Sequence, residues 1–330
     1  MKTLPRAPAC LAAFATSFVL AAASTGAAAQ TKWDLPSGYG ANTFQVQNLQ
    51  WFAEEVDKAT AGKLKITVHP GASLFKANEI KRAVQTSQTQ IGEFILSGAA
   101  NENALFGVDA IPFLATTYAE AKKLNDVSVP YLDKLLASQG MKLLYTVPWP
   151  GQSLYSKKPV ASLADLKGTK MRAYNPATTR IAEFAGAQPV TIQLAELPQA
   201  LATGGVDNFL TSSASGVDSK LYEHVKYFYD VSAWLPRNAV VVNQKAFDAL
   251  DKPTQAAVLK VAAAAGERGW RTSEQKDAEY LKELAAKGMT VDTGNVTLKR
   301  ELKEIGARMT DEWLKVAGAD GKAITDAYRK

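Results

Sequence analysis

The chain has 330 residues, of which 38 are lysine or arginine and 32 are aspartate or glutamate, so its formal net charge is +6 at pH 7. The basic residues are scattered and form no run, which argues against a nucleic-acid-binding protein. One cysteine and two histidines, none at the spacing of metal ligands, lead us to expect no disulfide, no metal site and no cofactor.

Residues 1–29 have the pattern of a cleavable secretion signal. Lys2 and Arg6 form a basic start, an apolar stretch follows over residues 10–23, and small residues precede Gln30. The apolar stretch is too short to span a bilayer. We therefore expect a mature chain that begins near Gln30, lies in the periplasm and is not inserted in the membrane. Loss of the signal removes two positive charges and leaves a net charge of +4.

From Gln30 to about residue 148, strand-like and helix-like segments alternate, as is typical of an α/β fold with a parallel sheet. Apolar periodicity predicts helices over 49–59, 80–84 and 131–136, and strands over 64–68, 94–96 and 141–146. The sequence Pro-Trp-Pro-Gly at 148–151 interrupts this periodicity. We predict that the chain crosses there from one lobe to a second.

The second half begins with the same alternation and ends in longer helices. It predicts strands over 170–173, 228–232 and 239–242, and short helices over 179–184 and 196–203. A second crossover is expected at 234–237. Helical character then runs from Asp251, a good N-cap, to Lys287, a length of roughly 50 Å that could span both lobes. Gly266 and Gly269 are candidate bend points, and two separate helices are the alternative.

Most catalytic motifs are missing from the sequence. It has no Gly-x-Ser-x-Gly elbow and no phosphate-binding loop, and Gly38-Tyr39-Gly40 lacks the third glycine of a dinucleotide fingerprint. The hydroxyl-rich stretch 211–216 could contact a ligand or cap the helix that follows it. Arg172 ends a predicted strand, where α/β folds bind ligands, and its guanidinium could hold a carboxylate. A solvated arginine is the alternative at that position.

The chain resembles the solute-binding component of tripartite ATP-independent periplasmic (TRAP) transporters, the DctP-type family. The resemblance covers nearly the whole mature chain and is carried by five segments in order, at 66–74, 111–114, 162–172, 184–190 and 200–207. It implies two α/β lobes, strands that cross between them, a long helix spanning both, and an arginine, here Arg172, that clamps a ligand carboxylate.

The resemblance also suggests lobe boundaries and a ligand. We place lobe I at 30–148 with a return segment at about 239–275, and lobe II at 149–238 with a C-terminal segment at about 276–330. Gln152 stands where sialic-acid-binding members carry a second arginine, so we expect one ligand carboxylate. The predicted ligand is a compact monocarboxylate such as a 2-hydroxy or 2-oxo acid with an apolar or aromatic tail. The predicted ligand-binding residues are Arg172, Gln152, Thr211, Ser212, Ser213, Trp149, Trp234, Tyr39 and Ser97.

These features predict a binding protein that is not an enzyme. It would capture a small organic acid by lobe closure and deliver it to the small and large membrane subunits of a TRAP permease. One alternative is a ligand-sensing protein that serves a receptor or sensor kinase. A second alternative is a periplasmic hydrolase or lyase.

Overall fold

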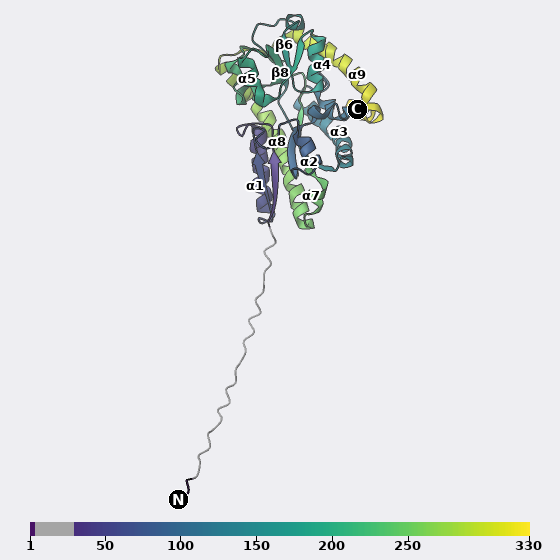
Figure 1. Cartoon of the computed structure of the whole chain (residues 1–330). Helices are drawn as coiled ribbons and strands as arrows, with labels where there is room; N and C mark the ends of the chain where they lie inside the picture. Colours follow the sequence, from purple (N-terminus) through teal and green to yellow (C-terminus); the bar gives the residue numbers. More distant parts are fainter. Residues whose placement is uncertain (4–29) are drawn as a thin grey trace.

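The computed structural model describes residues 1–3 and 30–330, and it has two lobes joined along one side by a long helix (Figure 1). Most of the predicted secretion signal, residues 4–29, lies outside the described residues. No helix within the described residues is long and apolar enough to cross a membrane. In Figure 1 the lower lobe carries α1, α2 and α7, the upper lobe carries β6, β8, α4 and α5, and α8 passes between them.

The described residues form eleven strands and nine α-helices. The strands are β1 (Thr31–Pro36), β2 (Leu64–His69), β3 (Ile91–Ile95), β4 (Met141–Pro148), β5 (Gln152–Ser156), β6 (Lys170–Ala173), β7 (Gln188–Thr191), β8 (Asn208–Ser212), β9 (Tyr227–Tyr229), β10 (Arg237–Asn243) and β11 (Thr290–Asp292). The helices are α1 (Phe44–Ala59), α2 (Ile80–Gln85), α3 (Tyr118–Ser138), α4 (Pro176–Phe184), α5 (Leu197–Ala202), α6 (Ser213–Asp218), α7 (Gln244–Asp248), α8 (Lys252–Ala286) and α9 (Val296–Arg329).

The strands of the lower lobe differ from the simple parallel sheet expected from the sequence. β1 and β2 do pair in parallel, but β3 and β4 are separated by β10, which is antiparallel to both. The parallel prediction is therefore wrong for this sheet. Its central strand comes from about 90 residues farther along the chain, and local alternation carries no information about such a distant partner.

The upper lobe contains one six-stranded mixed sheet with the order β11-β9-β5-β8-β6-β7. β6 is parallel to both of its neighbours, β7 and β8, whereas β5 is antiparallel to β8 and β9. The carboxyl end of β6 therefore lies beside the carboxyl ends of two parallel strands. That edge is where an α/β sheet binds ligands.

Two crossovers carry the chain between the lobes, as predicted. The link from β4 to β5 runs beside the link from β9 to β10, because the N–H of Trp149 donates to the carbonyl of Pro236 and the N–H of Gln152 donates to that of Trp234, each at 2.8 Å. Gly151 permits this close approach, since a Cβ there would lie 1.9 Å from Oγ of Ser232. The two lobes are thus connected by a pair of adjacent segments.

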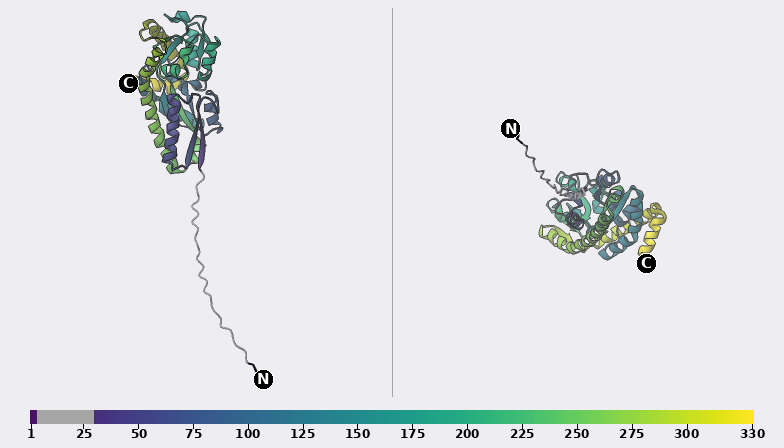
Figure 2. Two further views of the ribbon diagram at one scale, coloured as in Figure 1. Left: turned by 90° about the vertical axis from the view of Figure 1, so that its left-hand side faces the viewer. Right: turned by 90° about the horizontal axis from the view of Figure 1, so that it is seen from below.

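The long helix α8 is continuous over 35 residues, so the alternative of two helices is wrong. Asp251 caps its first turn by accepting the N–H of Thr254 at 2.7 Å. The helix packs along α1 and β4 in the lower lobe and reaches α6 and β11 in the upper lobe (Figure 2). Gly266 and Gly269 both lie inside this continuous helix. They allow close packing on β4, because a Cβ on Gly269 would lie 2.4 Å from Cγ2 of Val147.

The last helix, α9, contacts both lobes. It packs on α3, and Glu312 in α9 pairs with Arg180 in α4 at 2.7 Å. The helix is kinked at Gly318, whose φ of +62° and ψ of −147° fall outside the helical region. The lobe boundaries given above stay a prediction.

Candidate functional site

A cavity of about 460 Å³ lies between the two lobes and is lined by residues from both. Residues of the lower lobe and of the crossovers include Tyr39, Lys81, Glu93 and Trp149, and residues of the upper lobe include Gln152, Arg172, Tyr174, Asn175, Thr191 and Thr211. A volume of this size suits a small metabolite. The lining contains both charged groups and aromatic rings, which is the composition expected for an organic acid with an apolar part.

Arg172 is the central charged group of the upper wall. It extends from β6, its side chain is only 3% exposed, and its Nε donates to the carbonyl of Ile192 at 2.8 Å. Its Cζ also lies 4.7 Å from the ring centroid of Tyr174. Burial lowers the pKa of Arg172 from 12.5 to about 10, so the guanidinium remains charged at neutral pH.

No acidic side chain of the described residues pairs with Arg172. Its Nε is fixed by Ile192, and its two terminal nitrogens have no acceptor among the described residues. A buried charge without a partner is unusual, because desolvation costs several kcal/mol unless another charge compensates it. The planar pair of terminal nitrogens has the geometry that binds a carboxylate through two parallel hydrogen bonds.

The other cation of the lining already has a partner. Nζ of Lys81 lies 2.6 Å from Oε2 of Glu102, and it also lies 5.4 Å above the ring of Phe106. This pair leaves Arg172 as the lining cation without an acidic partner among the described residues. The cavity therefore offers one strong carboxylate position, in agreement with the expectation of a single ligand carboxylate.

Four more of the predicted site residues line the cavity: Gln152, Thr211, Trp149 and Tyr39. Oε1 of Gln152 accepts the Tyr174 hydroxyl at 3.2 Å, and its Nε2 donates to Pro150. The rings of Tyr39 and Trp149 lie 4.9 Å apart and form an aromatic wall. The geometry thus gathers these four residues with Arg172 around one space.

The other predicted site residues lie outside the lining, which departs from the expectation of direct contact. Ser212 caps α6 by accepting the N–H of Ser215 at 3.1 Å, and Ser213 donates to Asp277 in α8 at 3.0 Å. Ser97 accepts a hydrogen bond from Asn175 at 2.8 Å, and Trp234 is buried in an apolar cluster. The hydroxyls of Ser212 and Ser213 are thus engaged in local structure. Phe209 of β8 also lies outside the lining, because it stacks on Tyr155 in the core of the upper lobe.

The lining residues that the sequence reasoning missed include Tyr174, Asn175 and Glu93. Tyr174 and Asn175 directly follow the carboxyl end of β6, so the argument that selected Arg172 could have found them. Glu93 lies within the apolar run of β3 and is 1% exposed. A single charged residue inside a buried strand is a usable signal, because glutamate is almost never buried without a partner.

A chain of hydrogen bonds orients Glu93. The indole N–H of Trp149 donates to Oδ1 of Asn238 at 3.0 Å, and Nδ2 of Asn238 donates to Oε1 of Glu93 at 2.9 Å. The hydroxyl of Ser37 donates to Oε2 of Glu93 at 2.6 Å. Burial raises the pKa of Glu93 from 4.5 to about 6, although these two hydrogen bonds oppose the rise. Glu93 is therefore mostly ionised at pH 7.

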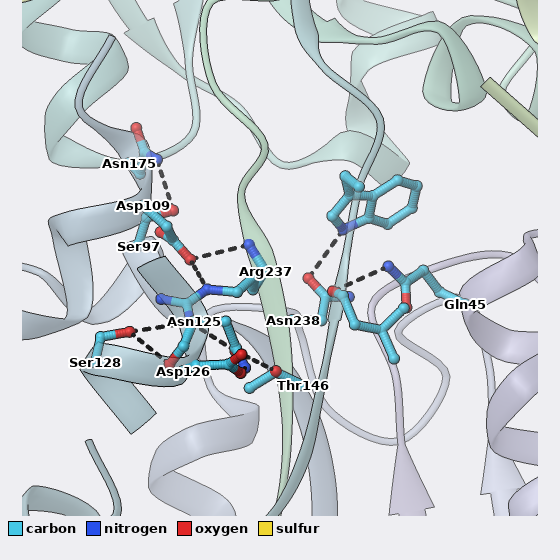
Figure 3. A network of polar contacts seen from close by, with 12 residues as sticks. Gln45, Ser97, Asp109, Asn125, Asp126, Ser128, Thr146, Asn175, Arg237 and Asn238 are labelled. Carbon is cyan, nitrogen blue, oxygen red and sulfur yellow. Dashed lines mark hydrogen bonds and ion pairs between the residues drawn. The ribbon is translucent and has the colours of Figure 1, made fainter. Parts of the chain in front are cut away.

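Arg237 precedes Asn238 in the chain, points to the opposite face of the sheet and anchors the crossover. Consecutive side chains of a strand face opposite sides of the sheet, and in Figure 3 Arg237 turns toward Asp109 while Asn238 turns away from it. Nε of Arg237 donates to Asp109 at 2.9 Å, and its Nη1 donates to Asn125 at 2.7 Å. This buried ion pair fixes the start of β10 and so the position of Asn238.

No group of three or more histidine, cysteine, aspartate or glutamate side chains is placed to hold a metal ion within residues 1–3 and 30–330. Besides the Lys81–Glu102 pair, the charged groups of the cavity are Arg172 from the upper lobe and Glu93 from the lower lobe. Such a site can bind and orient an organic acid that has both a carboxylate and a polar group.

Residues 37–315 match the model of the family described as bacterial extracellular solute-binding protein, family 7 (DctP). Among solved structures, the chain is similar to DctP6 of Bordetella pertussis, an extracytoplasmic solute receptor binding pyroglutamic acid. The two are 53% identical with a TM-score of 0.89, over 91% of this chain and 99% of that one. DctP7 of the same organism, also binding pyroglutamic acid, is 45% identical with a TM-score of 0.90, over 91% and 100%.

A third similar structure comes from an unidentified marine microbe. It is a TRAP solute-binding protein specific for pyroglutamate, in complex with pyroglutamate that co-purified with it. It is 45% identical to this chain with a TM-score of 0.89, over 91% of this chain and 99% of that one. The three similar proteins thus share one ligand.

Proposed function

The chain belongs to the bacterial extracellular solute-binding proteins of family 7, the binding components of TRAP transporters, and we propose that it captures pyroglutamate in the cavity between its lobes. Pyroglutamate is a five-membered lactam with one carboxylate. It is a compact monocarboxylate, as predicted, but its polar group is a lactam in place of a 2-hydroxy or 2-oxo group.

The observation that carries this proposal is the state of Arg172. Its guanidinium is buried in the wall of the cavity, and its terminal nitrogens have no acceptor among the described residues. A ligand carboxylate would supply the missing counter-charge. Lobe closure would exclude water and so strengthen the attraction between the two charges. The aromatic wall of Tyr39 and Trp149 would pack against the methylene groups of the lactam ring. The identity of 53% to a pyroglutamate receptor supports the same ligand.

The rest of the proposal concerns location and partners. Members of this family are periplasmic receptors that bind organic acids and work with membrane permease components, and they are not enzymes. For this chain we propose export by the signal in residues 1–29, delivery of the acid to a small and a large permease subunit, and no turnover of the ligand. The comparisons give no support to a sensor-linked protein or to a hydrolase or lyase.

The test is calorimetry on protein from which any ligand has been removed by unfolding and refolding. We expect pyroglutamate to bind with one-to-one stoichiometry and to raise the apparent stability by about 2.7 kcal/mol at a hundredfold excess over Kd. Lactate and pyruvate serve as comparison acids, and mass spectrometry of the protein as first purified should identify a bound acid. If no pyroglutamate binds and none co-purifies, the proposal is wrong.

A further inference from the structure

Glu93 is a buried carboxylate that no positive side chain of the described residues neutralises. It lines the cavity from β3 in the lower lobe, whereas Arg172 lines it from β6 in the upper lobe. Among the described residues, the two charges are too far apart to form an ion pair with each other. A buried charge of this kind is costly to keep and calls for a role beyond packing.

The protein contacts of Glu93 fix it as a hydrogen-bond acceptor. An indole N–H is a donor only, so Trp149 determines that Asn238 presents its oxygen to the indole and its NH₂ to Glu93. Ser37 accepts the backbone N–H of Tyr39 at 3.3 Å, which leaves its own hydroxyl hydrogen for Glu93. Each carboxylate oxygen thus accepts one bond from the protein. An ionised carboxylate has about four acceptor positions, so two remain.

A ligand held by Arg172 shares the cavity with this second charge, which lines it from the other lobe. A group that offers only lone pairs, such as a ketone, an ether oxygen or a second carboxylate, would be repelled by Glu93 in a site that excludes water. A donor would instead gain a charge-assisted hydrogen bond. The site therefore has a preference for what the ligand carries beside its carboxylate.

We infer that Glu93 accepts the lactam N–H of the bound acid, and that it thereby selects carboxylates with a hydrogen-bond donor on the carbon next to the carboxylate. This inference rests on the proposed function, because it takes Arg172 as the anchor of the ligand carboxylate. Glu93 is then a specificity residue of the lower lobe, and the ligand joins the two lobes through one charge on each side. Binding of 2-oxo acids is disfavoured, since their keto oxygen presents an acceptor to Glu93.

The experiment compares pyroglutamate with its lactone analogue, 5-oxotetrahydrofuran-2-carboxylate, which replaces the N–H by a ring oxygen and keeps the size and the carboxylate. Calorimetry is done with the native chain, Glu93→Gln and Glu93→Asp. We expect the native chain to prefer the lactam by about 100-fold or more, because a site built for a donor rejects the analogue that lacks it. In Glu93→Gln, which keeps the size of the side chain, the preference should shrink to about tenfold or less.

Glu93→Asp keeps the charge but shortens the side chain by one methylene. It should therefore also reduce the preference for the lactam over the lactone. The native comparison stands by itself if either variant fails to fold. Equal binding of lactam and lactone by the native chain, or an unchanged preference in both variants, overturns the role of Glu93 while pyroglutamate binding itself persists. Absence of pyroglutamate binding to the native chain is a different result, and it overturns the proposed function together with this inference.

Discussion

Asn175 and Ser97 connect the two lobes beside the cavity, because Nδ2 of Asn175 donates to Oγ of Ser97 at 2.8 Å (Figure 3). Asn175 is the N-cap of α4 in the upper lobe, and its Oδ1 accepts the N–H of Thr178 at 2.8 Å. Ser97 lies in the short helix Leu96–Ala99 that follows β3 in the lower lobe. Both side chains are buried, and we expect this hydrogen bond to break when the lobes open.

Replacing Ser97 by alanine should weaken ligand binding without contact to the ligand. The variant leaves the Asn175 amide without an acceptor only when the lobes are closed, at a cost of about 1–3 kcal/mol, since water can serve it when they are open. We expect roughly tenfold weaker binding of pyroglutamate in calorimetry. Ser138→Ala, at an exposed serine of α3, is the control. An unchanged affinity in Ser97→Ala would show that this bond does not stabilise closure.

Replacing Arg172 by glutamine should abolish tight binding and leave the fold intact. Removing one partner of a buried charge pair costs about 2–5 kcal/mol, so affinity for pyroglutamate should fall by roughly 30-fold to a few thousandfold. Stability of the ligand-free protein should hold or rise, because burial already disfavours the charged guanidinium and lowers its pKa to about 10. Calorimetry and thermal unfolding measure the two effects.

Arg180→Gln is the matched control for that variant. Arg180 lies on α4, is 40% exposed and pairs with Glu183 and Glu312 on the surface. Exposed pairs of this kind contribute little to stability, so both affinity and stability should change little. If Arg172→Gln binds pyroglutamate as well as Arg180→Gln does, the anchor of the carboxylate lies elsewhere.

Glu93→Gln should stabilise the ligand-free protein above pH 6 and not below pH 4.5. Burial raises the pKa of Glu93 to about 6, so the folded chain takes up this proton at higher pH than the unfolded chain. The native protein therefore loses stability as pH rises from about 4.5 through 6, by about 2 kcal/mol in all. Glutamine carries no charge and avoids that loss.

The measurement is urea-induced unfolding of the native chain and of Glu93→Gln at pH 4, 6 and 8. Glu183→Gln, at an exposed glutamate of α4, is the control for replacing a glutamate by glutamine. A variant less stable than the native chain at pH 8, or a difference that is the same at pH 4 and pH 8, would contradict the prediction. The result also bears on function, because a binding group that destabilises the free protein is a common cost of activity.

Local sequence patterns predicted the elements that depend on near neighbours. The strand over 170–173 and the long helix from Asp251 were both correct, since alternation, a capping residue and a following glycine are local signals. Arg172 followed from its place at the end of that strand. The order of the lower sheet did not follow, because β10 inserts between β3 and β4 through contacts far apart in sequence.

The errors in the predicted site also come from partners that are far apart in the sequence. Ser212 and Ser213 have the right chemistry for a ligand, but their hydroxyls are taken by the cap of α6 and by Asp277 of α8, a partner more than 60 residues away. Glu93 gave a signal of its own, as a charge in an apolar strand, yet its meaning depends on Asn238 and Ser37. Sequence alone marks such a residue as unusual without revealing what it faces.

Gly269→Ala should destabilise the protein although alanine is the better helix former. Gly269 lies in α8 against β4, and a Cβ there would be 2.4 Å from Cγ2 and 2.8 Å from Cγ1 of Val147. Overpacking of a core costs about 1–3 kcal/mol, whereas the gain in helix propensity is about 1 kcal/mol. We therefore expect a net loss of about 1 kcal/mol in urea-induced unfolding, with Ala264→Gly at an exposed position of α8 measuring propensity alone.

Combining Gly269→Ala with Val147→Ala should recover part of that loss, because the second change removes both methyl groups that the new Cβ would meet. Val147→Ala alone leaves a cavity and costs roughly 2 kcal/mol. In the double variant the new methyl fills that space. Its loss of stability should therefore be smaller than the sum of the two single losses by about 1 kcal/mol or more. Nδ2 of Asn48, 3.0 Å from the same Cβ position, keeps the recovery incomplete. Strictly additive losses would mean that close packing of α8 on β4 is not what requires glycine at position 269.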